Sequence, residues 1–159
     1  MGNFKELAEI GSYISICVGV GVAMWQLISY KIEHKQRKKQ ATIEFYQNIR
    51  KEFVGLLDKV SAIYPNQEIV RINDVQNNED MLSVIREYLC HMEKFSVGVN
   101  GKIYDFATFE AMSGISAMGW FDKLEEVIGH FRRGNPDVFK NFENLVIKLK
   151  KTKSQNKEN

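Results

Sequence analysis

The sequence predicts an all-α protein, with one N-terminal transmembrane helix followed by a cytoplasmic antiparallel bundle of about four helices. Three observations lead to this prediction. An uncharged apolar run covers residues 10–30, the apolar residues after it recur at helical spacing, and no stretch alternates with period two over a useful length. The chain of 159 residues contains only two prolines, Pro65 and Pro136, which suits long helices.

The predicted membrane span follows a short N-terminal tail, residues 1–9. Residues 10–30 read IGSYISICVGVGVAMWQLISY and carry no charged side chain. A helix of about 21 residues at ~1.5 Å per residue is roughly 31 Å long, which matches the ~30 Å hydrocarbon core of a bilayer. A signal peptide and a buried core helix are the alternatives. A signal peptide would begin with a basic segment, whereas the tail has one lysine and two glutamates.

A basic juxtamembrane segment, residues 31–40, follows the span. Its cations outnumber the single lysine of the tail, and they are Lys31, Lys35, Arg37, Lys38 and Lys39. The positive-inside rule then predicts a protein of the inner membrane with the N-terminus outside and the C-terminal domain in the cytoplasm. These cations could also attract anionic headgroups, so membrane lipids are predicted partners. The alternative is that the run is only a topology signal.

Small residues recur every four positions within the span, at Gly11, Ser15, Gly19 and Ala23. This spacing places them on one face of a helix, where small side chains allow a second helix to approach closely. The pattern predicts a helix–helix interface in the membrane and a homo-oligomer. Because small residues are common in spans, the alternative is a chance series.

The helical domain is predicted to cover residues 41–150. Its first helix continues from the span and ends at Pro65, with one apolar face made of Phe45, Ile49, Phe53, Leu56, Val60 and Ile63. Residues 65–78 have the composition of a loop with a short apolar insert. We expect Asn78 to cap the second helix, which carries apolar residues at helical spacing up to Phe95 and ends between Gly98 and Gly101.

Two further helices complete the predicted bundle. Asp105 is a good N-cap for a helix that runs to Gly134, in which Gly114 and Gly119 are positions for a bend or a close helix contact. Asn135 and Pro136 are a start signal for the last helix. Its predicted core residues are Phe139, Phe142, Leu145, Val146 and Leu149. The polar tail, residues 151–159, is predicted to be disordered.

No motif of catalysis, cofactor binding or metal binding is present in the sequence. The histidines, His34, His91 and His130, form no HExxH or ExxH pair, and Cys17 and Cys90 belong to no zinc-binding spacing. There is no phosphate-binding glycine loop and no nucleophile elbow. We therefore predict no catalytic residues, no cofactor and no metal. The net charge of +2 is too small to indicate nucleic acid as a partner.

Three carboxylates are candidates for chemistry. Glu87 and Glu93 flank the apolar face of the second helix, and Glu110 lies in the third. Arg86 and Lys94 are adjacent in sequence, so the structural interpretation is a solvated or salt-bridged side chain. We favour the structural interpretation for all three.

The stretch REYLCHMEKFSVGVNGKIYDFATFE resembles the signature of an uncharacterised bacterial family of short single-span membrane proteins with a helical domain of unknown function. The matching positions are Tyr88, Met92, Glu93, Phe95, Gly98, Val99, Gly101, Ile103, Tyr104 and Asp105. A later element of the family is similar to Asn135, Pro136, Phe139, Phe142 and Glu143. The likeness covers roughly residues 10–150, and Cys90 and His91 match no element of it. It implies an anchored helical architecture, with Gly98, Gly101, Tyr104 and Asp105 as a turn motif, and implies no enzymatic activity.

These patterns favour a non-enzymatic, membrane-anchored helical interaction module that self-associates and binds a cytoplasmic protein partner. The alternative is a membrane-acting effector, of anti-phage or toxin type, whose oligomerised spans perturb the bilayer. A span without charges offers no obvious water-lined pore surface, which weakens that alternative. An enzyme with an unfamiliar site is the third hypothesis.

Overall fold

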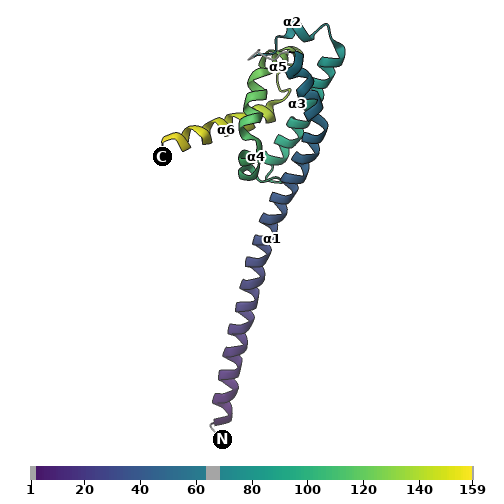
Figure 1. Cartoon of the computed structure of the whole chain (residues 1–159). Helices are drawn as coiled ribbons and strands as arrows, with labels where there is room; N and C mark the ends of the chain where they lie inside the picture. The colour runs from purple at the N-terminus through teal and green to yellow at the C-terminus, as the bar shows by residue number, and fades with distance from the viewer. Residues whose placement is uncertain (1–2, 64–68, 159) are drawn as a thin grey trace. The chain divides into compact units, whose positions relative to one another are not determined.

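The computed structural model describes the backbone of residues 3–63 and 69–158, and the side chains of residues 18–51 and 69–155 with a few between them. It divides into two compact units, Met1–Arg37 and Lys38–Asn159, which we describe separately. Every regular element in the described ranges is a helix (Figure 1). The prediction of an all-α fold is confirmed.

Helix α1 (Asn3–Ile63) accounts for the described part of the first unit and contributes its later residues to the second. The second unit adds five helices within the described ranges: α2 (Ile72–Val75), α3 (Glu79–Asn100), α4 (Phe106–Lys123), α5 (Glu125–Phe131) and α6 (Lys140–Glu158). The predicted helices correspond to the later part of α1, to α3, to α4 with α5, and to α6.

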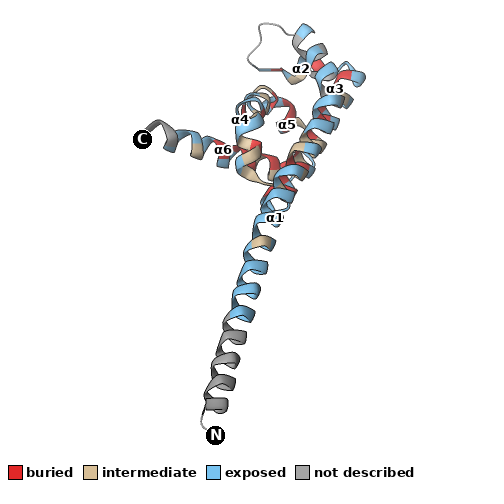
Figure 2. Cartoon of the chain, turned by 60° about the horizontal axis from the view of Figure 1, so that its bottom comes forward, coloured by how far each residue is buried: buried red, intermediate tan, exposed pale blue. Residues whose placement is uncertain are grey.

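The core of the second unit contains the residues that helical spacing predicted. Figure 2 shows buried residues along α3, α5 and α6. The fully buried side chains include Leu89, Phe95, Phe109, Phe142 and Leu145. From α1, Ile49 is buried, and Phe45 and Tyr46 pack against the core. Phe53, Leu56, Val60 and Ile63, which were predicted for the same face, lie outside the described side chains.

The aromatic ring of Phe95 joins three parts of the second unit. It is fully buried on α3 and lies 4.6 Å, centroid to centroid, from Phe109 of α4. Its centroid is 5.6 Å from that of Phe45 and 6.4 Å from that of Tyr46, both on α1. The Tyr104 ring, from the connection between α3 and α4, stacks on it at 5.1 Å. Aromatic pairs at these separations add specific attraction to the burial of their apolar area.

A Schellman motif ends α3. The Ile103 N–H donates to the Gly98 carbonyl at 2.8 Å, and the Lys102 N–H donates to the Val99 carbonyl at 3.1 Å. The motif requires a left-handed residue at the position that donates the second of these bonds, which here is Lys102, with φ of 59°. Neither Gly98 nor Gly101, the two glycines of the predicted turn motif, takes that role. Gly98 is instead required for space, because a Cβ there would overlap the Tyr104 ring.

The predicted third helix is broken at Leu124, whose φ of −98° and ψ of 9° separate α4 from α5. Neither predicted bend site, Gly114 nor Gly119, is the break. The Val70 N–H donates to the Lys123 carbonyl at 2.8 Å, so the end of α4 is satisfied by the segment before α2. Val70 is buried there, which explains the short apolar insert in the predicted loop.

Helix α6 differs from the prediction at both ends. It begins at Lys140 rather than after Asn135, because Phe139 has a left-handed φ of 59° that interrupts the helical path. At the other end, the predicted disordered tail is helical as far as Glu158. Adding residues to an existing helix carries no nucleation cost, and Thr152 and Ser154 donate hydroxyl hydrogen bonds to carbonyls four residues earlier.

The prediction of a transmembrane helix is wrong. Among the described residues, no helix combines the length and the apolar character needed to cross a membrane. Side chains of the predicted span are described from Val18 to Tyr30. Lys31 then ends the uncharged run. The side chains of residues 10–17 lie outside the described residues.

The predicted location depended on that span. The inner membrane, with the N-terminus outside and the helical domain in the cytoplasm, stays a prediction that the structure does not test.

We predict that Lys102→Gly stabilises the protein by about 0.5 to 1 kcal/mol, because glycine adopts the left-handed conformation without steric cost. Urea unfolding followed by circular dichroism measures the change. The matched control is Lys94→Gly within α3, which should lower the unfolding free energy by about 1 kcal/mol. Equal destabilisation by both substitutions would contradict the role assigned to Lys102.

Candidate functional site

Candidate metal ligands do not gather into one site in the described part of the chain. No group of three His, Cys, Asp or Glu side chains among them could hold a metal ion. The three histidines lie on different helices, and His34 stacks on Tyr30 within α1. Burial raises the pKa of Tyr88, which favours the protonated form of this phenol.

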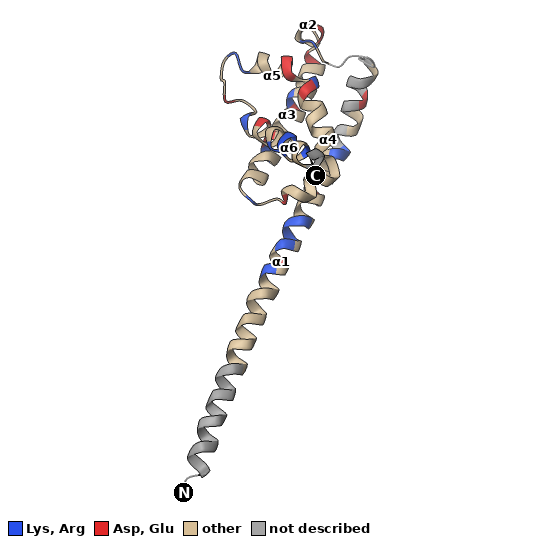
Figure 3. Ribbon diagram, turned by 90° about the vertical axis from the view of Figure 1, so that its left-hand side faces the viewer, with Lys and Arg blue, Asp and Glu red and all other residues tan. Residues whose placement is uncertain are grey.

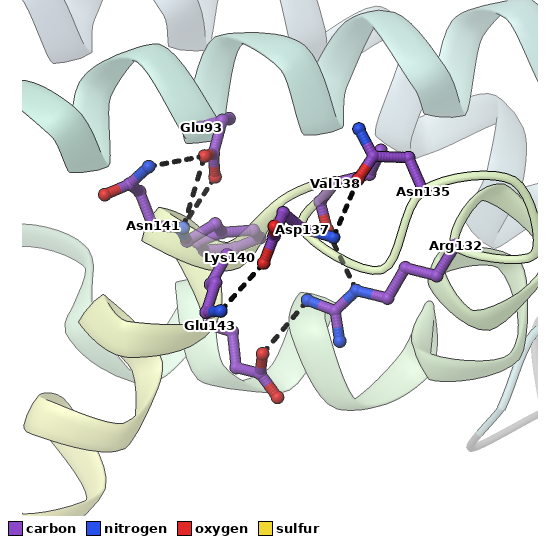
Figure 4. Close-up of polar contacts among 9 residues, drawn as sticks. Glu93, Arg132, Asn135, Asp137, Val138, Lys140, Asn141 and Glu143 are labelled. Atoms are coloured by element: carbon purple, nitrogen blue, oxygen red, sulfur yellow. Dashed lines mark hydrogen bonds and ion pairs between the residues drawn. The ribbon is translucent and has the colours of Figure 1, made fainter.

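A polar cluster surrounds the N-terminus of α6 (Figure 4). Glu93, half-buried on α3, accepts hydrogen bonds from the Asn141 N–H at 3.2 Å and the Phe142 N–H at 2.8 Å. It also accepts one from the Asn141 side-chain amide at 2.8 Å. The first N–H groups of a helix have no partner within the helix, and a negative charge there is favourable. Glu93 therefore caps α6 from a different helix.

Arg132 organises the loop that leads into α6. Its Nε donates to the Val138 carbonyl at 2.9 Å, and its terminal nitrogen pairs with the Glu143 carboxylate at 3.0 Å (Figure 4). Asp137 and Lys140 form a second pair at 2.7 Å. The hydrogen bond from Lys140 lowers the pKa of the Asp137 carboxyl. These contacts satisfy polar groups of the loop and fix where α6 begins.

The two segments of the family-like signature meet in this cluster. Glu93 belongs to the first segment, and Phe142 and Glu143 belong to the second. Both segments resemble the family in sequence, but no sequence pattern indicates that they are in contact in the fold. Glu93 is one of the three candidate carboxylates from the sequence, and its hydrogen-bond partners identify it as a helix cap.

The predicted turn motif is joined to α1 by a hydrogen bond. Asp105 caps α4 by accepting from the Thr108 N–H at 2.9 Å, as predicted. Its own N–H donates to the hydroxyl of Thr42 on α1 at 2.8 Å. That hydroxyl donates to the Lys38 carbonyl at 2.7 Å, and Thr42 is fully buried. Sequence reasoning missed Thr42, because its partner lies 63 residues away.

The other predicted positions do not form a described site. Gly11 and Ser15 lie outside the described side chains. Gly19 and Ala23 are exposed, and nothing lies within 4 Å of a Cβ built on Gly19. Figure 3 shows the predicted cations directly after the uncharged stretch of α1. Lys38 is half-buried, and the other four are exposed: Lys31, Lys35, Arg37 and Lys39.

An open groove lies between α4 and α6, where two adjoining hollows of about 550 Å³ each share Ile115, Met118 and Lys153. Its apolar lining consists of Ala107, Ala111, Gly114, Ile115, Met118, Gly119 and Leu149. Its polar lining consists of Glu110, Asp122, Lys150, Lys153 and Ser154. We call this surface the α4/α6 groove. Gly114 is a predicted position for a bend or a close helix contact, but no sequence pattern indicates the groove.

A family model described as a domain of unknown function, DUF4760, matches residues 13–149. The chain belongs to the DUF4760 family. The predicted membership of an uncharacterised family is thus confirmed. No curated protein and no solved structure gave a significant match to this DUF4760 chain.

We predict that Glu93→Ala lowers the unfolding free energy of this DUF4760 domain by about 2 kcal/mol. The substitution removes three hydrogen bonds and a negative charge at the start of α6. Urea unfolding measures it, and Glu87→Ala, an exposed position of the same helix, should change stability by less than about 0.5 kcal/mol. A Glu93→Ala effect as small as that of the control would rule out the capping role.

We also predict that Thr42→Val costs about 1.5 kcal/mol, because it leaves the Asp105 N–H without its acceptor. Thr42→Ser keeps the hydroxyl and should retain most of the stability. Thermal and urea unfolding of the two variants provide the comparison. If the valine variant were as stable as the serine variant, the hydrogen bond to Asp105 would contribute nothing.

Proposed function

We propose that this DUF4760 protein is a non-enzymatic helical interaction module that self-associates through α1 and binds a partner protein. The observation that carries the proposal is the apolar surface of α1. Nine side chains between residues 18 and 32 are 51–71% exposed: Val18, Val20, Val22, Met24, Trp25, Leu27, Ile28, Tyr30 and Ile32. We call this stretch the apolar segment of α1.

The apolar segment is exposed around the whole circumference of the helix. Successive residues of a helix differ by about 100°, so Val20, Trp25 and Tyr30 point in three different directions. A helix that is apolar on every side is stable in water only when other elements cover it. Contiguous apolar patches of this kind mark interaction surfaces.

A second copy of α1 is the occupant that we propose for this surface. The nine exposed side chains present on the order of 1,000 Å² of area, which exceeds the ~800 Å² per partner of a standard protein interface. Every copy carries the same segment, and closed assemblies of identical subunits are the commonest oligomers. One partner helix covers only one side of the segment, so burial of the whole surface calls for an assembly of more than two copies.

The charge beside the apolar segment also affects this association. Lys31 lies in its last turn, Lys35 and Arg37 follow it, and Glu33 pairs with Arg37 at 3.4 Å. In a parallel assembly these cations would lie near those of the other copy and repel them. Salt screens such exposed charges. A parallel assembly should therefore tighten with rising ionic strength.

Sedimentation equilibrium of the full chain tests the proposal. We predict that the wild type is oligomeric at micromolar concentration and that Val22→Glu weakens the association at least tenfold, because it places a charge in the apolar interface. The matched control is Val97→Glu on α3, since Val97 is 50% exposed and Val22 is 51% exposed. The control should leave the association unchanged.

Two results would overturn the proposal. One is a wild-type chain that stays monomeric up to about 100 μM while its helical content matches the structure. The other is a chain that floats with lipid vesicles as a monomer, because the apolar segment would then be covered by lipid rather than by a second copy.

A further inference from the structure

We infer that the α4/α6 groove binds an amphipathic helix of a partner protein, and that the flank of this helix facing α6 is acidic. The inference rests on the proposed interaction function and specifies the class of partner. It uses the second unit alone and is independent of the apolar segment of α1.

The floor of the groove is apolar and follows one face of α4. Ala107, Ala111, Gly114 and Met118 are spaced by four, three and four residues, which is the spacing of a single helix face. Small side chains keep this floor low, and Gly114 lies so close to α6 that an added Cβ would be 3.1 Å from Leu149 Cδ2. A floor made of small residues allows the backbone of a bound helix to approach closely.

Ile115 stands at the edge of this floor and is 74% exposed. No other large apolar side chain in the described part of the chain has a higher exposed fraction. An isolated exposed isoleucine is ordinary, but Ile115 adjoins a concave apolar floor. A ligand seated on the floor would cover it.

The groove has the dimensions of a helix site. Its lining on α4 runs from Ala107 to Asp122, about 22 Å at ~1.5 Å per residue, or four helical turns. Helix-in-groove recognition uses anchors at positions i, i+3, i+4 and i+7 over such a length. A second copy of the same surface does not fit, because two concave surfaces leave a void between them.

The two walls carry opposite charges. Lys150 and Lys153 form the α6 wall, and Glu110 and Asp122 belong to α4. Lys150 is already paired with Asp122 at 2.7 Å. Among the described residues, Lys153 has no ion pair, and Lys151 adds a further positive charge outside the groove. The α6 wall therefore carries the excess positive charge and favours an acidic flank on the ligand.

The experiment uses two synthetic helical peptides of about 18 residues, the length of α4. They share one apolar face and differ in a flank of four glutamates or four lysines. Fluorescence anisotropy with the full chain should show tighter binding of the acidic peptide. We expect Lys153→Glu to weaken that binding roughly fivefold, since it replaces an attraction by a repulsion.

Reversing the charge at position 153 should also strengthen binding of the basic peptide. The Lys153→Glu chain should bind the basic peptide roughly fivefold better than the wild type does. Lys151→Glu on the same helix, outside the groove lining, should change binding of either peptide by less than twofold. Ala111→Phe, which fills the floor, should weaken both peptides.

Three results would overturn the inference: equal binding of both peptides, equal effects of Lys153→Glu and Lys151→Glu, or no effect of Ala111→Phe in a chain that remains helical. The same titration in the Val22→Glu background separates this inference from self-association. Peptide binding that persists in the monomer supports the groove even if the apolar segment of α1 has no role, and oligomers that bind neither peptide overturn the groove alone.

Discussion

The packing of one buried ring, that of Phe95, holds the second unit together. It contacts Phe45 and Tyr46 of α1, Tyr104 of the α3–α4 connection, and Phe109 of α4. Interiors are packed as densely as organic crystals, so a ring surrounded in this way fixes the spacing of every segment that touches it. The requirement for glycine at position 98 follows directly, because the Tyr104 ring can stack on Phe95 only where no Cβ is present.

The α4/α6 groove depends on the same turn of α3. Phe95 fixes one wall through Phe109 in the first turn of α4, and Glu93 fixes the other by capping α6 at Asn141 and Phe142. Phe95 acts by apolar packing, whereas Glu93 acts by placing a negative charge at a helix N-terminus. Glu93 and Phe95 thus have a structural role, which is to position the two walls of the groove that we propose as a binding surface.

The parts of the fold that depend on local interactions could be predicted, whereas the parts that depend on distant partners could not. Asn78 and Asp105 cap α3 and α4 as predicted, because each cap acceptor and its donor are three residues apart. The start of α6 was missed, because its cap is Glu93, 48 residues earlier than Asn141. The break at Leu124 was missed for the same reason, since it is completed by Val70. Apolar content predicted a membrane span, but it could not distinguish a bilayer from another protein chain as the cover for α1.

Hydrogen exchange of the Phe95→Leu variant tests the central claim most directly. The account predicts that slow exchange is lost together in three places: α1 around Ile49, the α3–α4 connection, and the first turn of α4. The α6 N-terminus, held by Glu93, should lose less protection. Loss confined to α3, with α1 and α4 as protected as in the wild type, would contradict the account, because the ring would then not be what unites these segments.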